Sequence, residues 1–290
     1  GGVPYWEYGL EQIQKLSKKN NIPLAILPAD GRNDERLDNF SNLPISTLRR
    51  LSELCNQGGP IASQAALAQM ALAAGLYASP VIGEKKIPQY GFWKPNKPLD
   101  KLPPNIESLK NSKLVIIIFY RSFIMANDLN PIRKLYYSFK KNNITSVGIF
   151  LPSLKEPVSA KWVQDQILNL GPSCIVNATA FSAKNKNGVS PLDIGNVPIF
   201  QIALSTNDKK SWEKEDRGLS PTNMAMHVAL PEIDGRIFAG VASFKKKLPT
   251  DSKLQFNEIK HQTYNDGISS ITQKVKSWIK LQNTSLKMKK

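Results

Sequence analysis

Two carboxylates and an arginine lie close together in the segment PEIDGR of a 290-residue chain. Glu232 and Asp234 are two residues apart, and Arg236 ends the segment. Paired carboxylates can coordinate a divalent cation or accept protons from a bound substrate, so Glu232 and Asp234 are our candidate catalytic residues. A turn closed by salt bridges is the competing interpretation of the same pattern.

Arg121 is the first candidate for binding an anion. It directly follows the apolar run KLVIIIFY, and Ser122 comes next. A buried arginine is costly unless it is paired. Its guanidinium therefore either bonds to a carboxylate of the protein or is available to a carboxylate of a ligand, and the sequence leaves both alternatives open.

Asn177 and Thr179 lie near the end of another apolar run, SCIVNATAF. Their amide and hydroxyl either orient a polar ligand or satisfy backbone groups of the following loop. Open α/β sheets bind ligands beyond the carboxyl ends of their strands. We therefore expect Arg121, Asn177 and Arg236 to gather at one rim of a parallel sheet, with Ser122 and Thr179 beside them, as a substrate-binding site.

Metal ligands cannot be assigned from this pattern. The chain has two histidines and two cysteines, which are too few and too scattered for a zinc site built from this chain alone. Cys174 lies in an apolar run and is expected to be a small buried residue. His227 follows helical spacing and is expected to be packed, although a role as ligand stays open.

Alternating strand and helix patterns would position these residues. Strands are expected at Lys113–Ser122, Thr145–Leu151, Ser173–Phe181 and Val197–Leu204, and after Asp234-Gly235. Helices are expected from Asn130, at Ala160–Leu170, Asp208–Glu215 and Ser220–Leu230, and around Tyr264 to Trp278. A continuous apolar strand is typical of a sheet that is covered on both faces. Because such alternation implies parallel pairing and right-handed crossovers, residues 113–290 are expected to form a doubly wound, mostly parallel α/β domain.

The first part of the chain, residues 1–79, is expected to be a smaller α/β segment. Helical patterns cover Tyr8–Asn20, Ser46–Asn56 and Ile61–Leu76, and PLAIL, at 23–27, reads as a short buried strand. Six of the chain's 20 prolines fall between residues 80 and 104. We therefore place a proline-rich linker at residues 80–112.

Composition predicts a globular protein of the cytoplasm. The hydrophobic fraction is 41% and the charged fraction 21%. No apolar run is long enough to cross a bilayer, and the first residues do not resemble a signal peptide. No G-x-x-x-x-G-K-[ST] motif is present, so we do not expect this chain to hydrolyse ATP through a P-loop.

The net charge of +16 raises the question of nucleic-acid binding. Half of the excess lies between Lys245 and Lys290, where 11 lysines face three acidic residues. The chain is rich in Lys, Asn and Ile, as A+T-rich coding tends to produce, and it contains no recognisable nucleic-acid motif. Composition alone is thus the favoured explanation, ahead of acidic ligands or partners, and nucleic acid is the least favoured.

Several segments together resemble one protein family. In the second half these are FYRSFIMANDLNP, FLPSLKEP, NATAFS, PLDIGNVPIFQIAL and RGLSPTNMAMHVALPEIDGRI, and in the first half GGVPYWEYGLEQIQKL, LAILPADGRNDERLDNFSNLP and NQGGPIASQ. In order and spacing they are similar to the large subunit of aerobic cobaltochelatase. The related magnesium chelatase H subunit shares the second half less closely.

The resemblance implies a fragment of an ATP-dependent enzyme complex that inserts metal into a tetrapyrrole. This subunit would hold the corrin, hydrogenobyrinic acid a,c-diamide, and Co²⁺ as the substrate metal during cobalamin synthesis. An AAA+ ATPase subunit and a subunit with an integrin-like domain would be its partners and would hydrolyse the ATP. The main metal-insertion residues are expected beyond residue 290. The rival reading within the family is a magnesium chelatase H subunit that binds protoporphyrin IX, and the rival from another class is a noncatalytic basic module for nucleic acid or an acidic partner.

The resemblance also assigns expected roles to individual residues. Arg121 and Arg236 would bind the carboxylates of the corrin, and Glu232 or Asp234 would accept ring protons or bind the metal. The family usually has histidine after Arg-Ser, where this chain has Phe123. If that histidine binds metal or takes protons, Phe123 cannot replace it.

Overall fold

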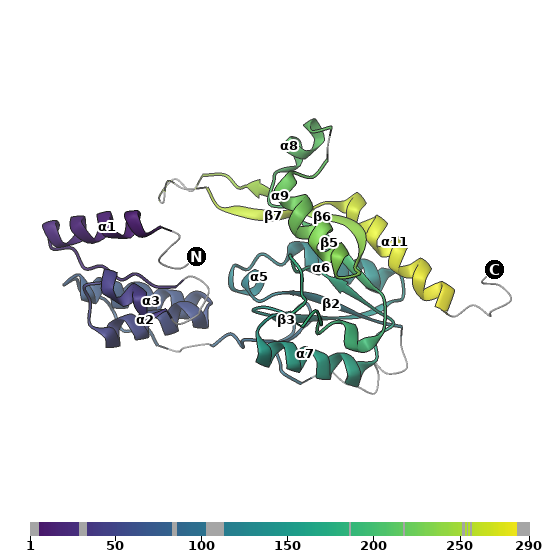
Figure 1. The fold of residues 1–290 in the computed structure, drawn as a ribbon, viewed down its shortest axis with the longest axis horizontal. Helices are drawn as coiled ribbons and strands as arrows, with labels where there is room; N and C mark the ends of the chain where they lie inside the picture. Colours follow the sequence, from purple (N-terminus) through teal and green to yellow (C-terminus); the bar gives the residue numbers. More distant parts are fainter. Residues whose placement is uncertain are drawn as a thin grey trace. The chain divides into compact units, whose positions relative to one another are not determined.

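The computed structural model describes residues 6–28, 34–82, 86–102, 113–185, 187–216, 218–250, 253, 255 and 257–282. The chain divides into two compact units, Gly1–Ile87 and Pro88–Lys290. Figure 1 shows helices in the first unit and a sheet flanked by helices in the second. None of the helices in the described ranges has the length and apolar character needed to cross a membrane.

The first unit contains helices α1 (Glu7–Asn20), α2 (Ile45–Gln57) and α3 (Pro60–Ala73) and the 3₁₀ helix η2 (Glu35–Phe40). Helices α2 and α3 pack through Leu51, Leu54 and Ala66, which form one buried cluster. Gly58 and Gly59 have φ angles of 69° and 86°, which other residues rarely adopt. This pair ends α2, and Pro60 starts α3 at a position where no backbone N–H is needed.

The strand expected at residues 23–27 is not formed. The N–H of Leu24 donates to Oδ1 of Asn42 at 2.6 Å, and the N–H of Ile26 donates to Oγ of Ser41 at 2.9 Å. Side chains thus satisfy backbone groups that a neighbouring strand would otherwise bond. In its described part the first unit is helical rather than α/β, although the expected helices are confirmed.

The second unit is built on a seven-stranded sheet in the order β1-β3-β2-β4-β5-β6-β7. The strands are β1 (Gly91–Trp93), β2 (Leu114–Tyr120), β3 (Thr145–Leu151), β4 (Cys174–Asn177), β5 (Ile199–Leu204), β6 (Ile237–Lys247) and β7 (Ile259–Thr263). Strands β2 to β6 are parallel to their neighbours, whereas β1 and β7 are antiparallel edge strands. The expected doubly wound, mostly parallel α/β fold is confirmed.

The apolar run of β2 explains how this sheet is covered. Val115, Ile117 and Phe119 pack against helices α6 (Asn130–Lys141) and α11 (Asn265–Gln282). The alternate residues Leu114, Ile116 and Ile118 pack on the opposite face, against α7 (Pro157–Leu170). Every β2 residue up to Phe119 is thus fully buried, as the lack of polar alternation predicted.

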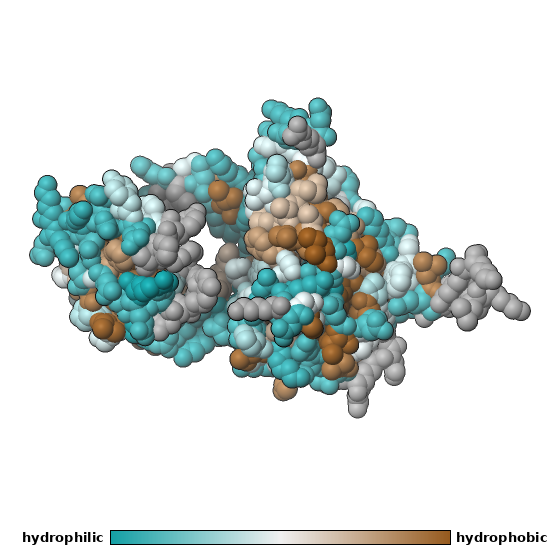
Figure 2. All heavy atoms as spheres, in the orientation of Figure 1, coloured by the Kyte–Doolittle hydropathy of each residue, from teal (hydrophilic) through white to brown (hydrophobic). Residues whose placement is uncertain are grey.

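Several shorter helices connect the strands. They are α5 (Ser122–Met125), η3 (Asp193–Gly195), α8 (Lys209–Lys214), α9 (Pro221–Met224), α10 (Leu230–Ile233) and the π-helical turn η4 (Ala225–Ala229), which joins α9 to α10. Figure 2 shows apolar surface over the α9–α10 helix, where the side chains of Met224 and Ile233 are exposed.

The expected linker at 80–112 contains part of the sheet. Strand β1 pairs antiparallel with β3, and Phe92 and Trp93 are buried. The ring of Trp93 lies edge-on to Phe119 with centroids 5.8 Å apart. Burying these large apolar side chains against the sheet is more favourable than leaving them in a solvent-exposed linker. The prediction of a linker is therefore wrong for residues 91–93. Residues 83–85 and 103–112 of the expected linker lie outside the described ranges.

The point at which the strand order reverses lies between β2 and β4. Strand β3 adds on one side of β2, and β4 returns to the other side. Ligands of such sheets bind beyond the carboxyl ends of the strands near this point. Here the Tyr120 hydroxyl donates to the Ala180 carbonyl at 2.9 Å and accepts from the Ala180 N–H at 3.2 Å, which ties the two strand ends together. We call the edge where β2 to β6 end the carboxyl edge.

Candidate functional site

Arg121 lies at the carboxyl edge, where the strand pattern predicted it. Its side chain is buried, with Nε donating to the Pro88 carbonyl at 2.8 Å and Nη1 lying 2.7 Å from Sδ of Met125. Burial lowers the pKa of the guanidinium from its usual value. The contact with Pro88 gives Arg121 a structural role, since it holds the segment before β1 against the end of β2. A role in substrate binding stays a prediction.

Asn177 and Thr179 also lie at the carboxyl edge, but they bond to each other. Oδ1 of Asn177 accepts from the Thr179 hydroxyl at 2.8 Å, and its Nδ2 donates to Oε1 of Gln201 at 2.8 Å. All three side chains are buried. This network matches the alternative in which the two residues stabilise the loop. Ser122 is exposed at the start of α5.

Glu232 and Asp234 occupy different environments. Oδ1 of Asp234 accepts from the Ser182 hydroxyl at 2.7 Å, and its Oδ2 accepts from the Ala183 N–H at 2.6 Å. The Asp234 carboxylate is buried and fixes the loop after β4, whereas Glu232 is exposed. Both remain candidate catalytic residues only as predictions from the sequence.

The expectation that Arg121, Asn177 and Arg236 gather at one rim is wrong. Arg236 precedes β6, whose first residue, Ile237, pairs with Phe200 near the start of β5. Arg121 follows the last residue of β2. A residue before a parallel strand and a residue after one lie at opposite edges of the sheet, so Arg236 is at the amino edge.

At the amino edge Arg236 has a protein partner. Its Nη1 donates to Oδ1 of Asp193, so the two form an ion pair with Arg236 buried and Asp193 partly exposed. Among the described residues, Nε and Nη2 of Arg236 have no hydrogen-bond partner. The PEIDGR turn is therefore not closed by an ion pair among its own described residues. Asp234 and Arg236 instead contact residues that are distant in sequence.

A buried carboxylate not singled out in the sequence organises the carboxyl edge. Oδ1 of Asp128 accepts from the backbone N–H of His261 at 2.9 Å. Its Oδ2 accepts from Nζ of Lys245 at 2.9 Å. Asp128 is 4% exposed, and Lys245 pairs with His261 in the β6–β7 ladder. We call Asp128, Ser243, Lys245, His261 and Phe123 the Asp128 cluster.

His261 is the titratable centre of this cluster. Its Nδ1 lies 2.9 Å from Oγ of Ser243, and its ring centroid lies 5.5 Å from that of Phe123. Burial, assisted by the positive charge of Lys245, lowers the pKa of His261 to about 4. The ring is therefore neutral at pH 7. Phe123, where the resemblance implies histidine, is thus in direct contact with a histidine.

His227 is a second buried imidazole. Burial lowers its pKa to about 4, and within the described structure its Nδ1 has no hydrogen-bond partner. It lies in the π-helical turn η4, a feature that often marks functional positions. A positive charge on His227 would lower the pKa of His261 further. No group of three His, Cys, Asp or Glu side chains suited to a metal ion occurs in the described ranges.

A groove opens beside His261, between the first half of α6 and strand β7. Its volume is about 380 Å³, within the range of ligand-binding pockets. It is lined by Asn130, Arg133, Lys134, Tyr137, His261, Gln262, Thr263 and Asn265. We call this the basic groove, because Arg133 and Lys134 are the only charged residues among the described residues that line it.

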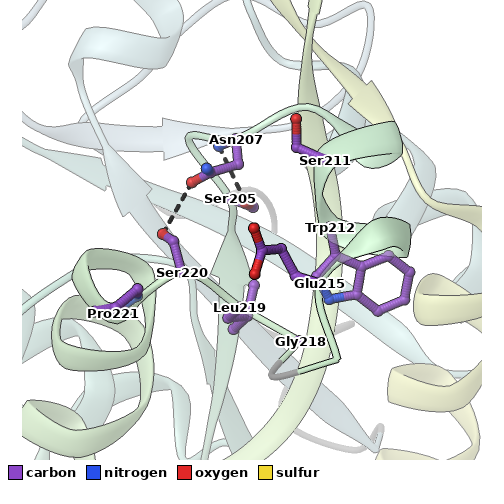
Figure 3. Close-up of a pocket in the computed structure, with 9 residues that line it drawn as sticks. All are labelled: Ser205, Asn207, Ser211, Trp212, Glu215, Gly218, Leu219, Ser220 and Pro221. Atoms are coloured by element: carbon purple, nitrogen blue, oxygen red, sulfur yellow. Dashed lines mark hydrogen bonds between the residues drawn. The ribbon is translucent and has the colours of Figure 1, made fainter.

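A smaller hollow lies beyond the end of β5 (Figure 3). Its lining includes the hydroxyls of Ser205, Ser211 and Ser220, the carboxylate of Glu215 and the indole of Trp212. The Asn223 side chain is fully buried beside it and bonds to Thr206, Asn207 and Ser220. With a volume of about 150 Å³ the hollow is below the usual size of ligand pockets, so it suits one small polar group rather than a whole ligand.

The chain is similar to proteins of one known family. Residues 53–290 match the model of the CobN/magnesium chelatase family. Two proteins named aerobic cobaltochelatase subunit CobN are similar: one from Sinorhizobium sp is 27% identical over 90% of this chain, and one from Pseudomonas aeruginosa is 28% identical over 84%. The matched regions are 21% and 20% of those proteins, so the chain spans about a fifth of their length.

A solved structure has the same fold. The catalytic subunit of cobaltochelatase from Mycobacterium tuberculosis aligns with 98% of this chain at a TM-score of 0.63 and 18% sequence identity. The aligned part is 23% of that structure. At this identity the likeness establishes the fold alone.

Proposed function

Because the chain belongs to the CobN/magnesium chelatase family, we propose that it is a segment of the tetrapyrrole-holding subunit of a cobalt-inserting chelatase. The observation that carries this proposal is the family match across residues 53–290, which includes every strand of the sheet. The two CobN relatives, which are similar over most of the chain, favour cobalt over magnesium.

The substrates follow from the same proposal. The macrocycle would be hydrogenobyrinic acid a,c-diamide, the metal would be Co²⁺, and the product would enter cobalamin synthesis in the cytoplasm. ATP would be hydrolysed by an AAA+ subunit working with a subunit that carries an integrin-like domain.

Two buried histidines offer chemistry that suits a metal-inserting subunit. Metal insertion removes two ring protons and strips water from the metal, so it needs lone pairs that are free at neutral pH. His227 and His261, each with a pKa of about 4, are unprotonated at pH 7 and can offer nitrogen lone pairs. The same low pKa makes them weak bases, so they suit metal contact better than proton removal.

Replacing Phe123 by His should strengthen Co²⁺ binding by about tenfold or more, because a second imidazole would face His261. Two imidazoles on one metal have their ring centres roughly 5 Å apart when the metal–nitrogen bonds are about 2 Å long. The Phe123–His261 centroid distance of 5.5 Å is close to this requirement. Titration of the visible absorbance of Co²⁺ measures the effect.

The matched control for this prediction is Phe123→Gln, which is polar but has no imidazole. It should leave Co²⁺ affinity close to that of the parent chain. Adding His261→Ala to Phe123→His should abolish the gain. Equal Co²⁺ affinities for Phe123→His and the parent would show that the two positions cannot share a metal.

The family also includes magnesium chelatase, so protoporphyrin IX is the second candidate ligand. Absorbance titration of the chain with both tetrapyrroles separates the two. Tighter binding of hydrogenobyrinic acid a,c-diamide supports the cobalt assignment, and tighter binding of protoporphyrin IX supports the magnesium assignment. Binding of neither, together with steeply salt-dependent DNA binding, would overturn the proposal in favour of a basic binding module.

A further inference from the structure

The basic groove is lined mainly by hydrogen-bond donors. Arg133 and Lys134 contribute cations, Tyr137 a hydroxyl, and Asn130, Gln262 and Asn265 amides. No carboxylate occurs among the described residues that line it. Such a lining attracts an anion and can orient its oxygens.

The two cations of the groove are not used elsewhere in the described structure. Arg133 and Lys134 are exposed, and their side chains form no ion pair or hydrogen bond with another described residue. Other exposed cations differ: Lys161 pairs with Asp165, and Lys209 pairs with Glu213. The groove cations can therefore bind a ligand without first losing a protein partner.

The backbone adds to this preference. The groove runs along the first two turns of α6, a helix of 12 residues, and includes its first residue, Asn130, where the partial positive charge of the helix N-terminus favours an anion. Its other wall carries His261, which is nine-tenths buried and has only Nδ1 bonded to another described side chain. The groove thus connects an anion-binding surface with the neutral imidazole of the Asp128 cluster.

We propose that the basic groove binds peripheral carboxylates of the tetrapyrrole, and that Arg133 and Lys134 are their partners. This inference rests on the proposed function and reassigns the carboxylate-binding role that the sequence suggested for Arg121 and Arg236. Both of those arginines contact other parts of the protein. Carboxylates held in the groove would place one rim of the macrocycle beside His261.

The test compares two double variants of the same helix. Arg133→Ala/Lys134→Ala removes two positive charges from the groove. Lys140→Ala/Lys141→Ala removes two exposed charges from the last turn of α6, outside the groove, and serves as the matched control. All four side chains are exposed, so both variants should fold. Affinity for hydrogenobyrinic acid a,c-diamide is measured by absorbance titration at fixed salt.

We expect the groove variant to bind the tetrapyrrole about tenfold more weakly, and the control to change by less than about twofold. Converting the tetrapyrrole carboxylates to methyl esters should weaken binding by the parent chain to the level of the groove variant. Inorganic phosphate alone should bind at least tenfold more weakly than the tetrapyrrole.

The contrary outcomes separate this inference from the proposed function. Tight binding that both double variants lose equally, or that the methyl ester retains, would overturn the groove assignment while the function survives. Phosphate binding as tight as that of the tetrapyrrole would reassign the groove to phosphate. No binding of the tetrapyrrole by the parent chain would overturn both proposals.

Discussion

The free energy of unfolding should be about 4 kcal/mol lower at pH 5 than at pH 7. The cause is two histidines, His227 and His261, whose pKa is about 6.5 in the unfolded chain and about 4 in the folded protein. Below the unfolded pKa, the unfolded chain takes up protons that the native protein does not. The stabilisation is thus fully present above about pH 7 and is lost as the pH falls toward 4.

The histidine count makes this prediction specific. The chain contains only two histidines, both buried, and few other side chains titrate in this range. Near pH 5.5 the slope of the free energy of unfolding against pH should approach the value for two protons, about 2.7 kcal/mol per pH unit. Urea unfolding at a series of pH values measures this slope.

Single variants show how much each histidine contributes to this pH dependence. His227→Leu removes a ring whose Nδ1 has no described partner, and His261→Gln keeps a polar group near Ser243. Each should reduce the slope to about one proton. A parent slope near zero, or a slope that neither variant changes, would show that the histidines are not buried in the neutral form.

Replacing Asp128 by Ala should lower the free energy of unfolding by about 3 kcal/mol, because it leaves a partly buried ammonium and a buried N–H without their acceptor. The lost bonds are those from Lys245 and from the His261 backbone, both 2.9 Å long. We take the low end of the usual range because the Lys245 side chain is 28% exposed. Chemical denaturation at pH 7 measures the effect.

A matched control uses an exposed ion pair of similar length. Asp165 pairs with Lys161 at 2.8 Å, and both side chains are largely exposed. Asp165→Ala should therefore cost less than about 1 kcal/mol. Adding Lys245→Met to Asp128→Ala should recover part of the loss. If Asp128→Ala and Asp165→Ala destabilise equally, the Asp128 cluster does not hold β7 to the rest of the carboxyl edge.

Local patterns were sufficient to predict most of the sheet. The strand TSVGIFL begins and ends where β3 does, and α6 begins at Asn130, as its proline at the second position indicated. Strands β1 and β7 were missed because they are short edge strands. Strand β7 has the sequence IKHQT, whose polar residues hide its pairing with β6.

The candidate site could be predicted only in part, because its contacts are distant in sequence. Strand ends located Arg121 and Asn177 at the carboxyl edge, and the same rule would have excluded Arg236, which precedes its strand. The contact between Asp128 and His261 joins residues 133 positions apart. One feature pointed toward this region: Phe123, which stands where the resemblance implies histidine, lies against His261.

The tetrapyrrole should bind at the carboxyl edge, and NMR of selectively labelled side chains can locate it. His261 lines the basic groove, whereas Trp278 lines a separate pocket together with Ile237, the first residue of β6, at the amino edge. On addition of hydrogenobyrinic acid a,c-diamide, the ring signals of His261 should shift while the indole N–H signal of Trp278 stays in place. A shift of the Trp278 signal with the His261 signals unchanged would place the tetrapyrrole at the amino edge and rule out binding in the basic groove.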